Sequence, residues 1–242
     1  MQLPQNIVRF LGRYSEGLRL ASEHGAASGV VAEYAYRNQP HGSGALGRWI
    51  DRSFLSSRAW DDVRQRVEKT KAAVAELVVQ RRARRLPTII LDVASGSARY
   101  LRELVQEQGG EDVIVVCRDR DTNQVMHGRQ LIAAEGLARF TFSVGDATDE
   151  SSYLANRDPD IVLAIDLFPQ LSHDDAVRTV VRLAFEHLSV GGCFVCTTVV
   201  RPYTGLGPWQ ANVPGSRLTV RSADTIADWL QAAGFEIGRA HV

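Results

Sequence analysis

None of the 242 residues belongs to an apolar run long enough to span a membrane. Residues 1–20 carry three arginines and a glutamate among their apolar residues, a pattern unlike that of a secretory signal peptide. From these two absences we expect a cytoplasmic protein with no membrane partner.

Neither sign of charge is in excess. Lysine and arginine together number 28, as do aspartate and glutamate, so the formal net charge at pH 7 is zero. The densest basic run, at residues 81–85, ends a predicted helix, where cations suit the helix dipole. A chain without a basic stripe is not expected to bind DNA or RNA. We therefore expect a small-molecule partner.

Cysteine is scarce, with three residues in predicted buried strands: Cys117, Cys193 and Cys196. The last two form a lone C-x-x-C, and positions three apart on a strand point to opposite faces. No second pair accompanies them, and no His/Asp/Glu cluster has metal-ligand spacing. We expect no zinc site, no redox pair and no other metal.

Apolar residues make up 45% of the chain, which is enough for one large or two small domains. Up to Pro87 they recur with helical spacing, and the longest predicted helix covers residues 58–83. We predict a helical extension over residues 1–86. Its apolar Val63–Val78 face must be buried, which favours a homodimer. Within the predicted helical extension, the Gly-rich segment 38–47 is either a linker or a mobile lid.

From residue 88 apolar strands alternate with helices, which predicts an α/β domain over residues 87–242. Fully apolar strands separated by helices indicate a doubly wound, mostly parallel Rossmann-like sheet covered on both faces. The predicted strands cover 88–93, 113–117, 140–144, 160–165 and 193–200. The predicted helices cover 98–108, 122–135, 149–155, 174–188 and 222–233.

Ligands of open parallel sheets bind beyond the carboxyl ends of the strands, and four predicted strands end in small or acidic residues. A turn of small residues, 94–98, follows the first strand. The next three strands are followed by Arg118-Asp119, Gly145-Asp146-Ala147 and Asp166. One such aspartate is an ordinary helix cap, whereas three on successive strands facing one crevice indicate a ligand site.

These residues fit an adenosyl ligand. Asp119 lies 23 residues after Gly96, a suitable place for a carboxylate that accepts from both ribose hydroxyls. Asp146 can accept from the exocyclic amine of adenine. Asp92, at the end of the first strand, lies near the expected position of a cationic amine.

The turn itself discriminates between two adenosyl ligands. A dinucleotide turn requires a small residue at position 99, where the helix packs closely, and this sequence has Arg99. A methyl-donor turn requires small residues at 94, 96 and 98, which are Ala, Gly and Ala. There is no Walker-type motif. The pattern favours S-adenosylmethionine over a nicotinamide dinucleotide.

Residues 89–198 resemble the class I (Rossmann-like) S-adenosylmethionine-dependent methyltransferases in the stretches at 91–98, 118–119, 145–147 and 191–192. More narrowly, the chain is similar to a bacterial family of predicted methyltransferases that are sometimes fused to a hydrolase domain. The stretches that carry this narrower likeness are 36–42, 46–52, 118–119 with 128–129, and 232–235.

The resemblance implies that Asp92, Ala94 and Gly96 line the methionine part of the donor, Asp119 the ribose, and Asp146 with Ala147 the adenine. We assign donor binding to Asp92, Ala94, Ser95, Gly96, Asp119, Arg120, Asp146, Ala147 and Asp166. Three features depart from the pattern. Ala94 and Ala98 replace glycines, residues 166–170 match the narrower family poorly, and the usual last strand is not evident.

Acceptor-side residues are harder to predict, because in-line methyl transfer requires positioning and desolvation more than a strong catalyst. Asp166 and His173, near the end of the fourth strand, are the catalytic candidates. Candidate substrate contacts lie in the extension and in the long irregular segment 201–218. They are Tyr36, His41, Trp49, Tyr203 and Trp209.

The sequence thus predicts a metal-independent methyltransferase that uses S-adenosylmethionine and a small-molecule acceptor. Two alternatives stay open at this point. One is a nicotinamide-dependent oxidoreductase on the same Rossmann architecture. The other is a methyltransferase-like scaffold that binds a ligand or partner without catalysis, since a fold alone does not establish an activity.

Overall fold

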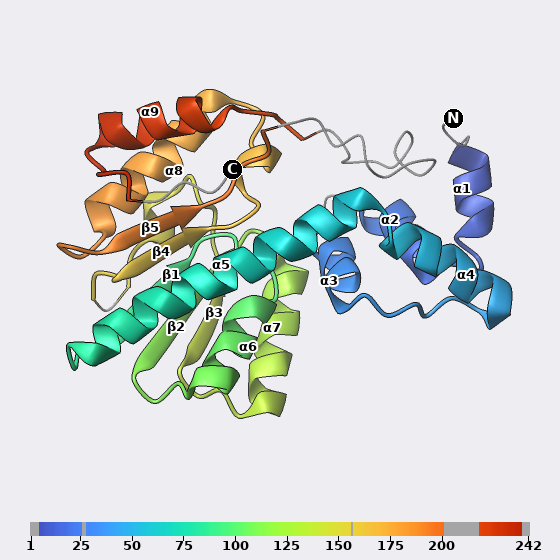
Figure 1. Cartoon of the computed structure of the whole chain (residues 1–242), viewed down its shortest axis with the longest axis horizontal. Helices are drawn as coiled ribbons and strands as arrows, with labels where there is room; N and C mark the ends of the chain where they lie inside the picture. Colours follow the sequence, from blue (N-terminus) through green and yellow to red (C-terminus); the bar gives the residue numbers. More distant parts are fainter. Residues whose placement is uncertain (1–4, 26–27, 156, 201–217, 239–242) are drawn as a thin grey trace. The chain divides into compact units, whose positions relative to one another are not determined.

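The computed structural model describes residues 5–25, 28–155, 157–200 and 218–238 (Figure 1). The chain forms two compact units that divide between Lys69 and Thr70. We call the described residues up to Lys69 the helical unit. Residues 70–200 and 219–238 are the sheet unit. None of the helices in these described ranges combines the length and apolar character needed to cross a membrane.

The helical unit contains four short helices and the start of a long one. They are α1 (Gln5–Leu11), α2 (Glu16–His24), α3 (Gly29–Arg37), α4 (Gly44–Leu55) and α5 (Arg58–Ala83). Serine side chains cap the second and third helices: Ser15 accepts from the Leu18 N–H and Ser28 from the Val31 N–H. The apolar faces of these helices share one core, whose largest members include Leu18, Tyr34, Phe54 and Trp60.

The sheet unit has five strands in the order β3-β2-β1-β4-β5, and every neighbouring pair is parallel. They are β1 (Thr88–Asp92), β2 (Val113–Asp119), β3 (Phe140–Val144), β4 (Ile161–Ala164) and β5 (Cys193–Cys196). The chain order reverses between β1 and β4, which is where open α/β sheets bind their ligands. The predicted fold class, a doubly wound parallel sheet with a helical extension, is confirmed.

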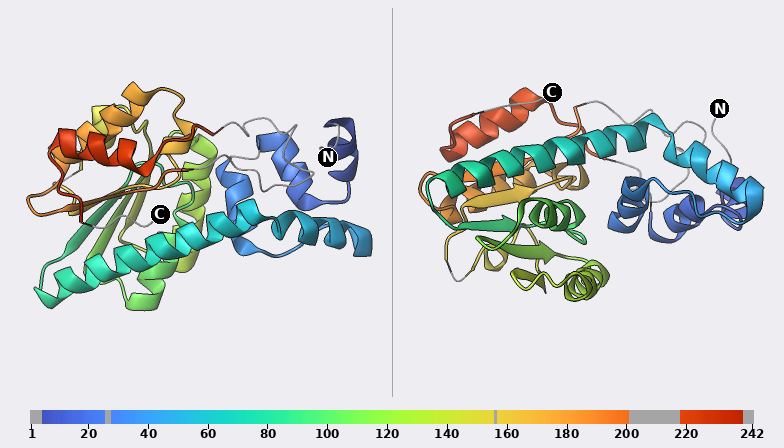
Figure 2. Two further views of the ribbon diagram at one scale, coloured as in Figure 1. Left: turned by 45° about the horizontal axis from the view of Figure 1, so that its top comes forward. Right: turned by 60° about the horizontal axis from the view of Figure 1, so that its bottom comes forward.

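Helices cover both faces of this sheet (Figures 1 and 2). On one face lie α6 (Arg99–Gln108) and α7 (Thr122–Glu135), and on the other lie α8 (Asp174–His187) and α9 (Ala223–Ala233). Burial on both faces explains why every residue of β1 and β4 is buried. The carboxyl ends of the strands are left for the turns that carry the predicted site.

Two predicted elements are shorter than expected. The helix predicted over 149–155 is a single 3-10 turn, η1 (Glu150–Ser152), because the Ser152 and Tyr153 hydroxyls hydrogen-bond to the carbonyls of Asp146 and Ala147. The strand predicted over 193–200 ends at Cys196. Its neighbour β4 ends at Ala164, where the pairing stops.

The two compact units divide within α5, at a different position from the domain boundary predicted between residues 86 and 87. The later part of α5 belongs to the sheet unit, where Val74 and Val78 are fully buried. Arg81 forms an ion pair with Asp160 and Arg82 with Asp112, which ties the end of α5 to the starts of two strands.

The homodimer prediction rested on an apolar face of α5. Of that face, Val63, Val74 and Val78 are already buried within one chain, and Val67 and Leu77 are partly buried. They therefore give no reason of their own for a second copy to bind, and the homodimer stays a prediction without structural support.

Candidate active site

The turn after β1 is held against the end of β2 by two hydrogen bonds. The Ser95 N–H donates to the Arg118 carbonyl at 3.0 Å, and the Gly96 N–H donates to Asp119 Oδ2 at 2.7 Å. Gly96 has a φ of +53°, a left-handed conformation that favours glycine. A Cβ at this position would have space, because its nearest neighbour would be 3.8 Å away. Conformation rather than crowding therefore accounts for the glycine.

Ala98 departs from the methyl-donor pattern at a measurable conformational cost. It has a φ of +49°, a left-handed conformation that costs a residue with a Cβ roughly 1 kcal/mol. Its N–H donates to the Ser95 carbonyl at 2.8 Å, which closes the turn. Arg99 then begins α6 and pairs with Glu103 at 2.8 Å, one helical turn along the same helix.

Asp119 ends β2 with both carboxylate oxygens engaged. Oδ2 accepts from the Gly96 N–H, and Oδ1 accepts from the Asp121 N–H at 2.8 Å. Burial raises the pKa of Asp119, while these two bonds favour its ionised form. The carboxylate is thus fixed beside the turn, where the sequence predicted a ribose contact.

Asp92 ends β1 and is completely buried. Its carboxylate accepts from the Tyr100 hydroxyl at 2.6 Å and from the Ala94 N–H at 3.2 Å. Burial raises the pKa of Asp92 to about 7. Asp92 is thus enclosed beneath the turn, and its predicted role in donor binding stays a prediction.

Asp146 and Ala147 follow β3, and they differ in solvent exposure. Asp146 is exposed, and its Oδ1 accepts from the Thr148 N–H at 2.8 Å and the Thr148 hydroxyl at 2.7 Å. These bonds lower the pKa of Asp146. Ala147 is buried. The positive charge of Arg120 lowers the pKa of both Asp119 and Asp146.

Asp166 follows β4 with a φ of +55°, which is rare for a residue other than glycine and is often found at functional positions. Its N–H donates to Thr197 Oγ1 at 2.8 Å, and its carbonyl accepts from the Gln170 amide at 2.8 Å. His173 precedes α8 on an exposed surface, and its side chain makes no cap hydrogen bond. Hydrogen bonds therefore fix the backbone of Asp166, whereas the His173 side chain is exposed and caps no helix.

Sequence reasoning missed Arg221, a buried arginine that braces the segment after β4. Its guanidinium donates at 2.8 Å to the Phe168 and Leu171 carbonyls and to Asp174. Its own N–H donates to the Val199 carbonyl. Nothing in the local sequence marks Arg221, because its partners lie about 50 residues away in the chain.

Arg221→Met is expected to lower the free energy of unfolding of the sheet unit by about 2–4 kcal/mol, because it orphans two buried carbonyls. Chemical denaturation would measure the loss. Arg178→Met is the matched control, since Arg178 also stacks on Trp229 but is exposed. Equal losses in the two variants would show that stacking, rather than the carbonyl contacts, is what Arg221 contributes.

The predicted substrate contacts of the extension all lie in the helical unit. The Tyr36 hydroxyl donates to Glu68 at 2.8 Å, His41 Nδ1 lies 2.9 Å from the Gln39 carbonyl, and Trp49 is 64% exposed. Tyr203 and Trp209 lie outside the described residues. The substrate roles of all five stay predictions.

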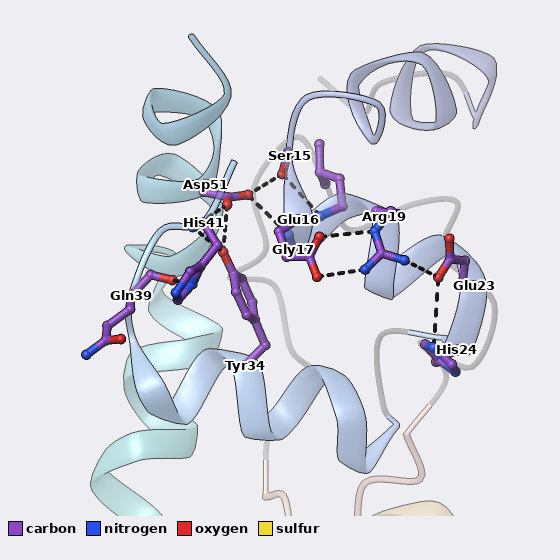
Figure 3. A network of polar contacts seen from close by, with 11 residues as sticks. Ser15, Glu16, Gly17, Arg19, Glu23, His24, Tyr34, Gln39, His41 and Asp51 are labelled. Atoms are coloured by element: carbon purple, nitrogen blue, oxygen red, sulfur yellow. Dashed lines mark hydrogen bonds and ion pairs between the residues drawn. The ribbon is translucent and has the colours of Figure 1, made fainter. Parts of the chain in front are cut away.

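A second missed residue, Asp51, organises the helical unit (Figure 3). Its fully buried carboxylate accepts from the Ser15 and Tyr34 hydroxyls and from the Gly17 and His41 N–H groups. The segment 38–47, for which linker and lid were both open, is therefore tied down at His41.

The close packing of two glycines also fixes segment 38–47. A Cβ on Gly42 would lie 2.3 Å from the Gly47 backbone, and a Cβ on Gly47 would lie 2.2 Å from the Tyr14 carbonyl. Ser43 donates its N–H to that carbonyl at 2.7 Å. These contacts favour a packed connection between α3 and α4 over a mobile lid.

Metal-ligating side chains do not gather anywhere in the described ranges: no group of three or more His, Cys, Asp and Glu residues there has the geometry to hold an ion.

A parallel β3-β2-β1-β4-β5 sheet with a small-residue turn after β1 gives this chain the Rossmann-like fold found in methyltransferases. The chain belongs to the family described as "Putative methyltransferase", whose model matches residues 2–211. It is 30% identical over 207 residues to the uncharacterized protein YnbC of Escherichia coli K12, covering 84% of this chain and 34% of that protein. The chain thus spans about a third of this relative's length.

Solved structures share the fold at low identity. A possible exported protein from Bordetella parapertussis superposes with a TM-score of 0.62 at 23% identity, covering 92% of this chain and 80% of that one. An O-methyltransferase family protein from Burkholderia thailandensis gives 0.58 at 17% identity, covering 79% and 59%. The [4+2]-cyclase SpnF gives 0.51 at 22%, covering 69% and 58%. These likenesses establish the fold, which hosts more than one chemistry.

Proposed function

We propose that this chain transfers a methyl group from S-adenosylmethionine to a small-molecule acceptor by in-line displacement, without a metal ion. S-adenosylmethionine supplies an electrophilic methyl group when bound. The chain's contribution is to position donor and acceptor and to exclude water, which can provide much of the rate enhancement of such a displacement.

The observation that carries the proposal is the bond between the Gly96 N–H and the Asp119 carboxylate. It fixes the turn after β1 and the carboxylate after β2 relative to one another. A carboxylate has about four acceptor positions, and two are used by Gly96 and Asp121, so two remain for a pair of ribose hydroxyls.

Asp146 supports the part of the proposal that concerns the adenine of the donor. Thr148 occupies its Oδ1, and no described residue donates to Oδ2. The low pKa keeps this exposed carboxylate ionised, so Oδ2 can accept from an exocyclic amine. Arg120 follows Asp119 in the chain, its charge lowers the pKa of both Asp119 and Asp146, and a guanidinium is suited to stack on a base.

On the acceptor side we assign the role of contact residue to Asp166 rather than His173. The backbone of Asp166 is fixed by Thr197 and Gln170, so its carboxylate has a defined position at the end of β4. A carboxylate there can accept a hydrogen bond from an attacking amine or hydroxyl and hold the proton that the acceptor loses.

Titration calorimetry with S-adenosylmethionine and S-adenosylhomocysteine tests the proposal directly. Both are expected to bind at one site per chain, with NADH as the control ligand that does not bind. Binding of NADH in place of both adenosyl compounds would overturn the proposal. Donor binding without methyl transfer to any member of a broad amine, phenol and carboxylic acid panel would favour a non-catalytic scaffold.

A further inference from the structure

The Asp92 carboxylate is buried with neutral donors only. Tyr100 and Ala94 satisfy it, and within the described part of the chain no lysine or arginine forms an ion pair with it. A carboxylate without a cation in a buried site is costly to ionise. It is therefore chemically suited to a site whose ligand brings the positive charge.

The titratable groups that face Asp92 do not supply that charge. Tyr100 lies on α6, and Cys117 and Asp119 lie on β2. Farther out, the charge of Asp166 acts on Tyr100, and the charges of Arg102 and Arg118 act on Cys117. Arg102 is paired with Glu135. Burial raises the pKa of Cys117 and of Tyr100, so both stay neutral near pH 7. The remaining neighbour, Asp119, is a carboxylate, whose charge raises the pKa of Asp92 instead of compensating its charge.

We propose that Tyr100 is a positioning residue for the methyl donor, because its hydroxyl holds the buried Asp92 carboxylate as the counter-charge of the donor's cationic methionine part. This inference rests on the proposed function, since it requires a cationic adenosyl ligand above the turn at residues 94–98. Neither the family's description nor the sequence pattern assigns a role to Tyr100.

The proposed pairing of the Asp92 carboxylate with a cationic ligand makes the affinity for the donor depend on pH in a defined direction. Without ligand the pKa of Asp92 is about 7, so near neutral pH a sizeable fraction of the side chains is protonated. A cationic ligand favours the ionised form. Affinity should therefore fall as pH drops, by about tenfold per pH unit below the midpoint, and binding near pH 7 should release roughly half a proton.

Tyr100 sets the position of that midpoint. Its hydrogen bond lowers the pKa of Asp92 against the effect of burial. Removing one hydrogen bond to a charged group shifts a pKa by roughly one unit. In Tyr100→Phe the midpoint of donor binding should consequently move up by about one pH unit, with affinity at high pH restored.

The experiment measures the affinities of three probes by calorimetry between about pH 5.5 and 8.5, a window that brackets the midpoint. S-adenosylmethionine and S-adenosylhomocysteine carry a cationic amine, and 5′-methylthioadenosine carries none. Any pH dependence of the neutral probe reports the ribose and adenine carboxylates, Asp119 and Asp146, whose ligand groups all three probes share. Titrations in two buffers of different ionisation enthalpy count the protons released.

Tyr34→Phe is the matched control. The Tyr34 hydroxyl donates to the buried Asp51 at 2.6 Å in the helical unit, the same bond length as in the pair formed by Tyr100 and Asp92. It should leave the midpoint of donor binding unchanged. Asp92→Asn should remove the pH dependence specific to the cationic probes and bind them at high pH about as weakly as the wild type binds them at low pH.

The outcomes separate this inference from the proposed function. A wild type that binds the cationic probes while Tyr100→Phe keeps the wild-type midpoint overturns the role of Tyr100 and leaves the proposed function intact. Failure of the wild type to bind any adenosyl probe at any pH overturns both. Binding of the neutral probe by Tyr100→Phe shows that the variant is folded, so a shifted midpoint then supports the proposal.

Discussion

Asp119→Ala is expected to lower the affinity for both S-adenosylmethionine and S-adenosylhomocysteine by more than about 100-fold. Two ribose hydrogen bonds to a charged acceptor are worth about 1.5–3 kcal/mol each, and their loss alone accounts for such a decrease. The variant also releases the Gly96 N–H and the Asp121 N–H, so the turn loses its tether. Titration calorimetry measures the change.

Asp112→Ala is the matched control for Asp119, because these aspartates lie at opposite ends of the same strand. Asp112 precedes β2 and pairs with Arg82 at 2.7 Å, away from the carboxyl ends of the strands. Its variant should bind both adenosyl compounds with wild-type affinity. Equal losses in the two variants would mean that β2 has been destabilised as a whole, and the ribose assignment would then fail.

The sheet could be predicted because its signals are local. Each strand is a short apolar run, and the helices between them leave few arrangements besides a parallel sheet. The carboxylates after the strands followed from the same pattern, since the ends of parallel strands meet at one edge. This is why Asp119 and Gly96, separated by 23 residues, could be paired before their hydrogen bond was known.

The buried polar residues that hold the site in place could not be predicted from the sequence. Tyr100 looks like an ordinary apolar position of α6, and only the packed structure shows its hydroxyl against Asp92. Arg221 resembles a surface arginine until three partners from residues 168–174 enclose it. Buried polar groups of this kind depend on contacts between distant segments, which neither periodicity nor local spacing encodes.

Asp51 illustrates the same limit in the helical unit. The sequence placed it within a stretch that resembles a methyltransferase family, but gave it no role. The structure shows why a carboxylate is needed there: four donors from α2, α3 and the segment before α4 converge on it (Figure 3). A role in holding the helices together accounts for this residue without any contact to a substrate.

Asp51→Ala is expected to lower the free energy of unfolding of the helical unit by about 4 kcal/mol, because the Ser15 and Tyr34 hydroxyls and the Gly17 N–H lose their acceptor and the His41 N–H keeps only the Tyr34 hydroxyl. Chemical denaturation followed by tryptophan fluorescence, to which Trp60 of this core contributes, measures the loss. Glu23→Ala is the control, since Glu23 is exposed and its ion pairs in the described ranges are with Arg19 and His24 of its own helix. It should change the stability by less than about 0.5 kcal/mol. If Asp51→Ala were as stable as Glu23→Ala, the Asp51 network would not be what fastens segment 38–47, and the choice between a packed connection and a lid would reopen.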